Sequence, residues 1–306
     1  MLTGIIPPIV TPLLDRDKLD LDGLERLIER TLSGGVTGLF LLGTTGEGAS
    51  ISYRLRRELI ERTCRQVNKR VSILVNITDT SYVESLSLAR HAADLGAQAL
   101  VVAPPYYLPP GQPELQEYLT HLVAELPLPL FLYNMPSLTK VPYELDTVRH
   151  AMDQPRIIGM KDSSGNIGYF REVASLLKNR PDWSLLVGPE DLLLDAIAAG
   201  GHGGVHAGAN LFPKLYVRLC EAARNGEPAK ARELHALAVR VRASLYEIGR
   251  HPSSLIKGIK CALNCLGVCS DFMSEPFHRF RPEQRAIVEQ RLAELTADLT
   301  RIGVYP

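Results

Sequence analysis

The sequence Ile157-Ile158-Gly159-Met160-Lys161-Asp162-Ser163-Ser164-Gly165 joins a short apolar run to a polar turn. Such runs, bounded by turn residues, are typical of strands buried on both faces, so we predict a strand that ends at Lys161. A lysine at the mouth of an apolar strand loses hydration, which favours the neutral amine and lowers its pKa. Neutral amines are nucleophiles that form Schiff bases with carbonyl compounds. A lysine that extends to solvent from a strand end fits the same residues, so the rest of the chain must decide.

The same strand-and-turn unit recurs along the chain and alternates with longer amphipathic segments. The segment from Ser81 to Gly96 illustrates the helical part: Ser81 followed by Glu84 predicts a capping box, and Gly96 suits a left-handed helix end. The expected strands, in chain order, are residues 4–10, 36–42, 71–76, 97–103, 128–133, 156–161, 183–188 and 203–206.

Strands that recur every ~20–35 residues, each followed by a helix, predict an α/β fold of the (β/α)₈ TIM-barrel type. A doubly wound open sheet is the main alternative, and it usually has a glycine-rich turn after its first strand. Here that turn reads Thr11-Pro12-Leu13-Leu14-Asp15, which favours the barrel. We predict a barrel over residues 1–226 and a helical extension, residues 227–306, packed on its outside.

Composition excludes several classes of function. The 306 residues contain 34 Lys and Arg against 34 Asp and Glu, so no positive charge directs the chain to nucleic acid or to an acidic membrane surface. The start of the chain lacks the pattern of a signal peptide, and no apolar stretch is long enough to span a membrane. We expect a soluble cytoplasmic protein whose five cysteines are buried, reduced hydrophobic residues.

In such barrels the active site lies at the carboxyl ends of the strands, and polar residues follow several of the predicted strands. Gly43-Thr44-Thr45-Gly46-Glu47 follows the second strand and leads toward a helix, so its hydroxyls and amides suit a carboxylate. A simple connecting turn is the equal alternative. Tyr133 ends the fifth strand, next to Lys161, where it could transfer protons; a core tyrosine with a paired hydroxyl is the alternative. Tyr106 and Tyr107 follow the fourth strand in a proline-stiffened loop that suits an interface or a site.

The last two strands offer weaker candidates. Glu190, after the seventh strand, could bind a polar substrate tail, but an acid in the first turn of a helix also stabilises that helix, and we favour the structural role. His206 follows the eighth strand without a partner at a recognisable spacing. No phosphate-binding loop, dinucleotide fingerprint or metal-ligand set occurs in the sequence, so we expect neither a cofactor nor a metal.

Taken together, four motifs resemble the dihydrodipicolinate synthase and N-acetylneuraminate lyase family of pyruvate-dependent class I aldolases. The resemblance covers essentially the whole chain. The motifs are Gly43-Thr44-Thr45-Gly46-Glu47, Tyr106-Tyr107, Tyr133-Asn134-x-Pro136 and Gly159-Met160-Lys161-Asp162-Ser163-Ser164-Gly165.

The resemblance implies a role for each matching residue. Lys161 would form a Schiff base with the 2-oxo carbon of pyruvate, and Tyr133 would be the general acid and base. Thr45 would hold the pyruvate carboxylate and Thr44 would join the proton relay. Tyr107 would complete that relay from a neighbouring subunit, since the family generally forms homodimers or homotetramers. The remaining positions would line the substrate site: Gly43, Gly188 and the backbone of Val205.

One position departs from the synthases of this family. They carry an arginine for the carboxylate of aspartate semialdehyde where this chain has Leu138, which cannot make that bidentate contact. The sialic acid lyases also carry leucine there, but they usually read Gly-Ser-Thr-Gly-Glu where this chain has Thr44, and a Tyr-Asp-Glu turn where it has Pro189-Glu190-Asp191. Lys140 could supply a positive charge instead.

The sequence therefore predicts a Schiff-base aldolase or lyase that acts on a 2-oxo acid of the 2-keto-3-deoxy sugar acid type. Dihydrodipicolinate synthesis and N-acetylneuraminate cleavage are the alternatives within the class. A catalytically silent relative that binds a 2-oxo acid is an alternative outside it, although the intact lysine, threonines and tyrosines speak against that. A sugar-phosphate barrel is disfavoured because Gly200-Gly201-His202-Gly203-Gly204 precedes the eighth strand.

Overall fold

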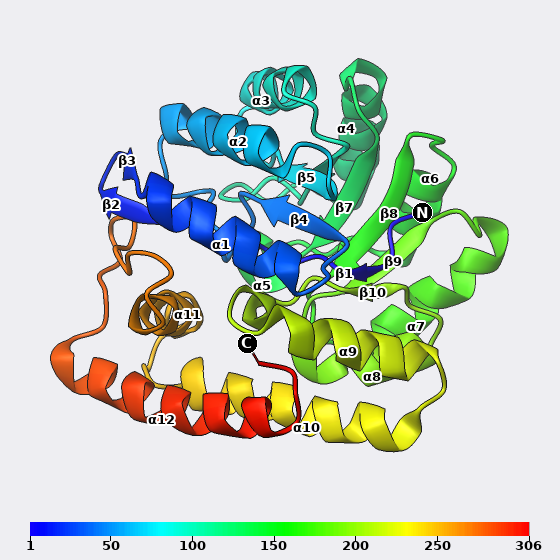
Figure 1. Cartoon of the computed structure of the whole chain (residues 1–306). Helices are drawn as coiled ribbons and strands as arrows, with labels where there is room; N and C mark the ends of the chain where they lie inside the picture. The colour runs from blue at the N-terminus through cyan, green and yellow to red at the C-terminus, as the bar shows by residue number, and fades with distance from the viewer. Residues whose placement is uncertain (306) are drawn as a thin grey trace.

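The computed structural model describes residues 1–305, and within them the main sheet has eight parallel strands in the order β1-β10-β9-β8-β7-β6-β5-β4. A parallel bridge between Pro8 and Phe40 brings the two ends of the sheet together, so the strands curl into a nearly closed barrel (Figure 1). All of the predicted strands are confirmed, although most are shorter than expected. They are β1 (Gly4–Ile5), β4 (Gly38–Leu41), β5 (Ser72–Asn76), β6 (Ala99–Val102), β7 (Leu130–Asn134), β8 (Ile157–Asp162), β9 (Ser184–Val187) and β10 (Gly203–Gly204).

Helices follow the strands and surround the barrel. They are α1 (Leu21–Ser33), α2 (Tyr53–Val67), α3 (Tyr82–Asp94), α4 (Gln112–Glu125), α5 (Pro136–Thr139), α6 (Leu145–Met152), α7 (Ile167–Leu176), α8 (Leu193–Ala198) and α9 (Pro213–Arg224). Short 3₁₀ turns lie at η1 (Leu177–Asn179), η2 (Glu190–Leu192) and η3 (Ala207–Asn210). Ser81 caps α3 as predicted by accepting from the N–H of Glu84. The reciprocal half of the capping box is absent, because the N–H of Ser81 donates to Asp79.

A small antiparallel hairpin between β1 and α1 was not predicted. It pairs β2 (Leu13–Asp15) with β3 (Lys18–Leu19), and in these two strands only Leu13 and Leu19 are buried. Strands of two or three residues contain too little alternation for a pattern to reveal them.

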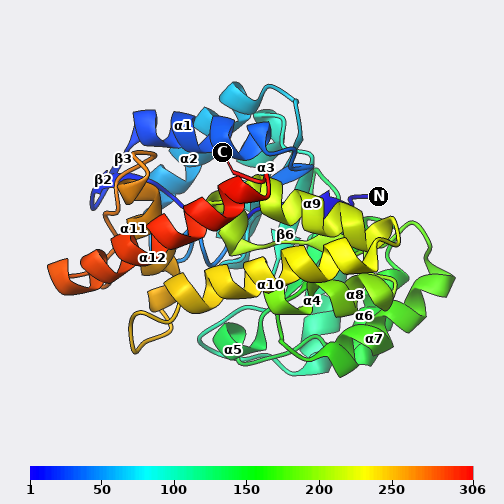
Figure 2. The ribbon, with the colours of Figure 1, turned by 60° about the horizontal axis from the view of Figure 1, so that its bottom comes forward.

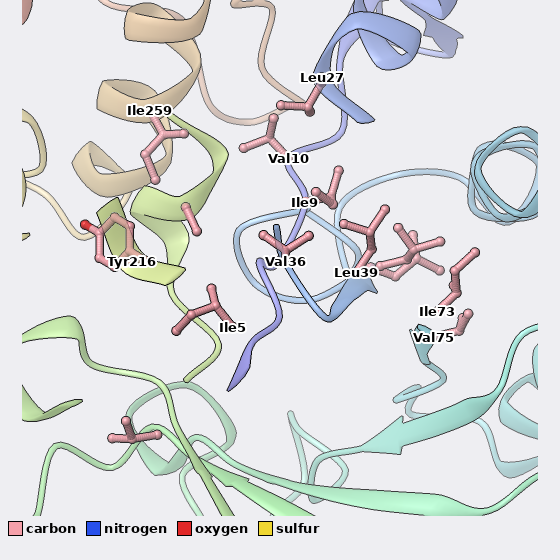
Figure 3. Close-up of a cluster of buried hydrophobic side chains, with 14 of the residues drawn as sticks. Ile5, Ile9, Val10, Leu27, Val36, Leu39, Ile73, Val75, Tyr216 and Ile259 are labelled. Atoms are coloured by element: carbon pink, nitrogen blue, oxygen red, sulfur yellow. The ribbon is translucent and has the colours of Figure 1, made fainter. Parts of the chain in front are cut away.

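The core forms two layers, because successive strand residues point to opposite faces of the barrel wall. Phe40, Phe131, Tyr133 and Val205 belong to the cluster that fills the barrel interior. Leu39 and its counterparts on the other strands point outward to a larger cluster shared with the helices. Figure 3 shows part of that outer cluster, which includes the strand residues Ile5 and Leu39 together with Leu27 of α1 and Tyr216 of α9.

The C-terminal segment is helical, as predicted, with α10 (Pro228–Leu245), α11 (Ser254–Cys265) and α12 (Pro282–Arg301). Figures 1 and 2 show these helices on one outer side of the barrel, with α10 and α12 side by side. Ile259 of α11 is fully buried and joins the same hydrophobic cluster as the outward-facing strand residues. The extension therefore shares a core with the barrel, while the boundary at residue 226 stays a prediction.

Two bulk expectations can be compared with the structure. None of the described helices is long and apolar enough to cross a membrane. All five cysteines are free; Cys265 is partly exposed, and the other four are buried as expected.

Candidate active site

Lys161 lies near the carboxyl end of β8, inside the barrel. It pairs in register with Tyr133 on β7, and its Nζ lies 4.0 Å from the centroid of the Tyr133 ring and 4.9 Å from that of Phe40. Burial lowers the pKa of the Lys161 amine, and the nearby Tyr133 partly offsets that shift. The lysine is therefore a desolvated amine held against aromatic rings and does not extend to solvent.

Tyr133 connects this amine to the loop after β4. The hydroxyl of Tyr133 lies 3.1 Å from Oγ1 of Thr44, a distance at which either group can donate the hydrogen bond. Thr45, the next residue, is buried. Because a proton can pass along such a pair of hydroxyls, Thr44 and Tyr133 together can exchange protons with a group bound at Lys161.

The loop that carries these threonines does not lead directly into a helix, contrary to expectation. Residues 42–51 form turns and bends, and α2 begins only at Tyr53. A helix N-terminus therefore cannot be the source of anion binding here. The polar groups that remain available are the hydroxyls and amides of the loop itself.

Asn134 and Asp162, for which no role was predicted, link the two strands that carry Tyr133 and Lys161. The Asn134 amide donates to Asp162 Oδ1 at 2.8 Å, and its own oxygen accepts from the N–H of Tyr143 at 3.0 Å. Burial raises the pKa of the Asp162 carboxyl, opposed by its hydrogen bonds. Their position immediately after Tyr133 and Lys161 was the available sequence signal.

A cavity of about 500 Å³ lies beside Thr44 and Tyr133, although Lys161 is not one of its lining residues. Its walls include Thr44, Tyr133 and Leu138 from the barrel, and His251 and Phe277 from the C-terminal extension. A cavity of about 580 Å³ between α1 and α9 shares no lining residue with it and contains none of the predicted catalytic residues. The size of that second cavity therefore does not identify it as the reaction site.

Gly43, Gly188 and Val205 were also predicted to line the substrate site, and only Gly43 is a lining residue of this cavity. Gly43 lines its wall, and Val205 is buried in the barrel interior with Tyr133. The N–H of Gly188 donates to the carbonyl of Asp162 at 2.7 Å. A Cβ on Gly188 would lie 2.0 Å from the Ser163 hydroxyl, so a larger residue at this position would displace the Ser163 side chain.

Leu138 and Lys140 differ in their relation to the cavity. Leu138, in α5, is 50% exposed and lines the cavity. Lys140 is exposed, adopts a left-handed φ of 65° and is not one of the lining residues. The leucine, and not the lysine, therefore faces the cavity.

The two tyrosines after β6 point in different directions. Tyr106 lines the cavity, whereas the neighbouring Tyr107 is 87% exposed and has a φ of 79°. Within its own chain Tyr107 makes no hydrogen bond to Thr44 or Tyr133 among the described residues.

Glu190 is buried away from the cavity, within a hydrogen-bond network. Its carboxylate accepts bonds from the N–H of Gly208 at 2.6 Å and from the hydroxyls of Tyr216 and Tyr246 at 2.7 and 2.8 Å. Burial raises the pKa of this carboxyl, and these hydrogen bonds oppose the shift. Both oxygens are already paired with protein groups, which fits the structural role favoured above, and we assign Glu190 no contact with substrate.

His206 is also held by contacts within the protein. Its Nδ1 lies 2.9 Å from the carbonyl oxygen of Gly188, and its ring packs against Tyr216. Burial lowers the pKa of His206 to about 4, so the ring is neutral at neutral pH. Among the described residues, no three His, Cys, Asp or Glu side chains cluster as a metal site.

Comparison with known proteins identifies the family. The family model described as "Dihydrodipicolinate synthetase family" matches residues 1–295. The chain belongs to the dihydrodipicolinate synthetase family. Among its relatives, the 4-hydroxy-tetrahydrodipicolinate synthase of Methanopyrus kandleri is 31% identical over 96% of both chains.

Solved structures of this family have the same fold. A dihydrodipicolinate synthase from Bacteroides thetaiotaomicron superposes with a TM-score of 0.93 at 52% identity, covering 96% of this chain and 98% of that one. YagE, a family member from Escherichia coli K12 solved in complex with pyruvate, gives a TM-score of 0.91 at 29% identity, covering 96% and 99%. The barrel prediction and the family resemblance are thus confirmed. The protein is an enzyme of the class I aldolase and lyase type.

Proposed function

We propose that the protein forms a Schiff base between Lys161 and the 2-oxo carbon of pyruvate or of a pyruvate-yielding 2-oxo acid. The amine attacks the carbonyl carbon, the oxygen leaves as water, and the resulting iminium makes the adjacent C–C bond labile or the adjacent C–H acidic. The observation that carries this proposal is the buried Lys161 amine beside Tyr133, with Thr44 in hydrogen-bond contact.

The other site residues receive the roles that suit their chemistry. Tyr133 transfers protons as general acid and base, with Thr44 as its relay partner. The hydroxyl and amide of Thr45 hold the carboxylate of the 2-oxo acid, and Gly43, Gly188 and the Val205 backbone shape the space around it. Tyr107 completes the relay from a neighbouring subunit, which accounts for its exposure in the single chain.

For the second substrate we propose a hydroxylated, uncharged chain, as in a 2-keto-3-deoxy sugar acid. No Lys or Arg occurs among the described residues that line the cavity. The lining acid Glu47 is paired with Lys260, and Leu138 occupies the wall. Neutral polar groups such as Asn76, Thr78 and Ser253 suit hydroxyls, whereas a second carboxylate would be desolvated without a cation.

4-Hydroxy-tetrahydrodipicolinate synthase activity is the second candidate. It is favoured by the similarity to the 4-hydroxy-tetrahydrodipicolinate synthase of M. kandleri and to the dihydrodipicolinate synthase of B. thetaiotaomicron, which is 52% identical. N-acetylneuraminate lyase activity, which occurs in the wider family, is the third candidate. We further propose that the protein is cytoplasmic and forms a homotetramer or homodimer. Light scattering of the purified protein would test the oligomeric state.

Borohydride reduction in the presence of pyruvate tests the central proposal. We expect mass spectrometry to find a reduced pyruvate adduct on Lys161, and a Lys161→Arg variant to remain unmodified. A lyase screen over 2-oxo-3-deoxy sugar acids, coupled to pyruvate detection, then tests the second substrate. An unmodified Lys161 at saturating pyruvate overturns the Schiff-base proposal. Turnover of aspartate semialdehyde with pyruvate, and of no sugar acid, selects the synthase instead.

A further inference from the structure

Glu47, in the loop between β4 and α2, forms a buried ion pair with Lys260 of α11. Glu47 Oε1 lies 2.5 Å from Lys260 Nζ, and the two side chains are 1% and 0% exposed. The other carboxylate oxygen accepts bonds from the N–H and the hydroxyl of Ser274, at 2.8 and 2.7 Å. The C-terminal extension thus supplies partners for both oxygens of a carboxylate that belongs to the barrel.

The loop that carries Glu47 is tightly folded around Thr44. The N–H of Glu47 donates to the carbonyl of Thr44 at 3.0 Å, and the N–H of Gly48 donates to that of Gly43 at 3.3 Å. Leu42 and Glu47 adopt left-handed φ values of 60° and 54°. Non-glycine residues persist in that region only where surrounding contacts hold them, and the buried carboxylate is such a contact.

The contact between Thr44 and Tyr133 therefore depends on the place of this loop. Thr44 and Glu47 both line the active-site cavity, whereas Lys260 is fully buried and does not reach it. If Lys260 loses its charge, the Glu47 carboxylate stays buried without its cation, which is strongly unfavourable. The loop then relaxes toward water and carries Thr44 and Thr45 with it.

We propose that Lys260 is a positioning residue for the reaction: through Glu47 it holds the β4–α2 loop so that Thr44 and Thr45 face the Schiff-base lysine. This inference rests on the proposed function, because it assumes that pyruvate binds at Lys161 against those threonines. It assigns a role in substrate binding to the C-terminal helical extension, beyond its packing on the barrel.

The experiment measures how adduct formation at Lys161 depends on pyruvate concentration in the full-length enzyme. We expect Lys260→Met to raise the half-saturating pyruvate concentration about tenfold or more, with a smaller loss of maximal trapping rate. The double variant Lys260→Met with Glu47→Gln removes the unpaired charge. It should regain thermal stability while its half-saturating concentration stays raised, because the glutamine lacks the ionic anchor.

Ile259→Ala is the matched control, since Ile259 precedes Lys260 on α11 but packs into the hydrophobic core. It should lose stability with no change in half-saturation, because only folded molecules bind pyruvate. If Lys260→Met does not fold, Ser274→Ala takes its place, and we expect it to raise the half-saturating pyruvate concentration about threefold. Folded variants of Lys260 or Ser274 with wild-type half-saturation overturn the inference alone. Absence of an adduct in the wild type overturns the proposed function, and this inference with it.

Discussion

The Thr44 hydroxyl lies 3.1 Å from the hydroxyl of Tyr133, although 89 residues separate them in the chain. Tyr133 in turn pairs in register with Lys161 on the neighbouring strand. Three strand ends thus bring a threonine hydroxyl, a phenol and a buried amine to one mouth of the barrel. Their proximity makes a lysine, ordinary by itself, a candidate nucleophile with a proton donor beside it.

Replacement of Tyr133 by phenylalanine tests this relay. The ring keeps its packing against Phe40, so we expect the fold to persist, while turnover falls by about 10²- to 10⁴-fold because proton transfer is lost. Steady-state pyruvate release and the rate of borohydride trapping measure the effect. Thr44→Ser, which keeps the hydroxyl, should stay close to wild type. Near-normal turnover in Tyr133→Phe would remove the phenol from the mechanism.

The pH dependence of adduct formation tests the buried amine. Burial lowers the pKa of Lys161 below its usual 10.5, and only the neutral amine attacks the carbonyl. We therefore expect the trapping rate to rise with pH, with a midpoint below 10.5. The Lys161 amine has a higher pKa in the unfolded state than in the folded state, so the unfolded state binds its proton more readily. The free energy of unfolding therefore rises with pH between these two pKa values. A midpoint at or above 10.5 contradicts the desolvation argument.

Leu138→Arg tests the choice of second substrate. An arginine on the cavity wall can bind a second carboxylate bidentately, so we expect condensation of pyruvate with aspartate semialdehyde to increase about tenfold or more. Cleavage of sugar acids should fall in the same variant. Lys140→Ala is the control and should change neither rate, because Lys140 does not line the cavity. An unchanged synthase rate in Leu138→Arg would show that the leucine does not decide the substrate.

Ile259→Ala tests whether the barrel and the extension unfold together. Removal of this fully buried side chain should lower the free energy of unfolding by about 2–5 kcal/mol, through lost burial and a cavity. Because its cluster spans both segments, we expect one urea transition that shifts as a whole. Circular dichroism and tryptophan fluorescence from Trp183 should report the same midpoint. Two separate transitions would mean that the extension unfolds independently.

Much of the fold was predictable because the relevant signals are local. Most barrel strands are short apolar runs, and such buried parallel strands need no partner information to be recognised. The hairpin of Leu13–Asp15 and Lys18–Leu19 was missed because it is too short for a pattern. The ion pair of Glu47 and Lys260 was equally invisible, since 213 residues separate its members.

Sequence alone determined the alternation of strands and helices, and hence which residues stand at strand ends. It also identified Lys161, Tyr133 and Thr44 as candidates, through residue type and position. The tertiary structure decided which of these groups meet, because barrel closure and strand register set distances that no local pattern contains. The tertiary structure also shows that Glu190 is held in a buried hydrogen-bond network. It places Leu138 in the cavity wall, whereas Lys140 does not line the cavity.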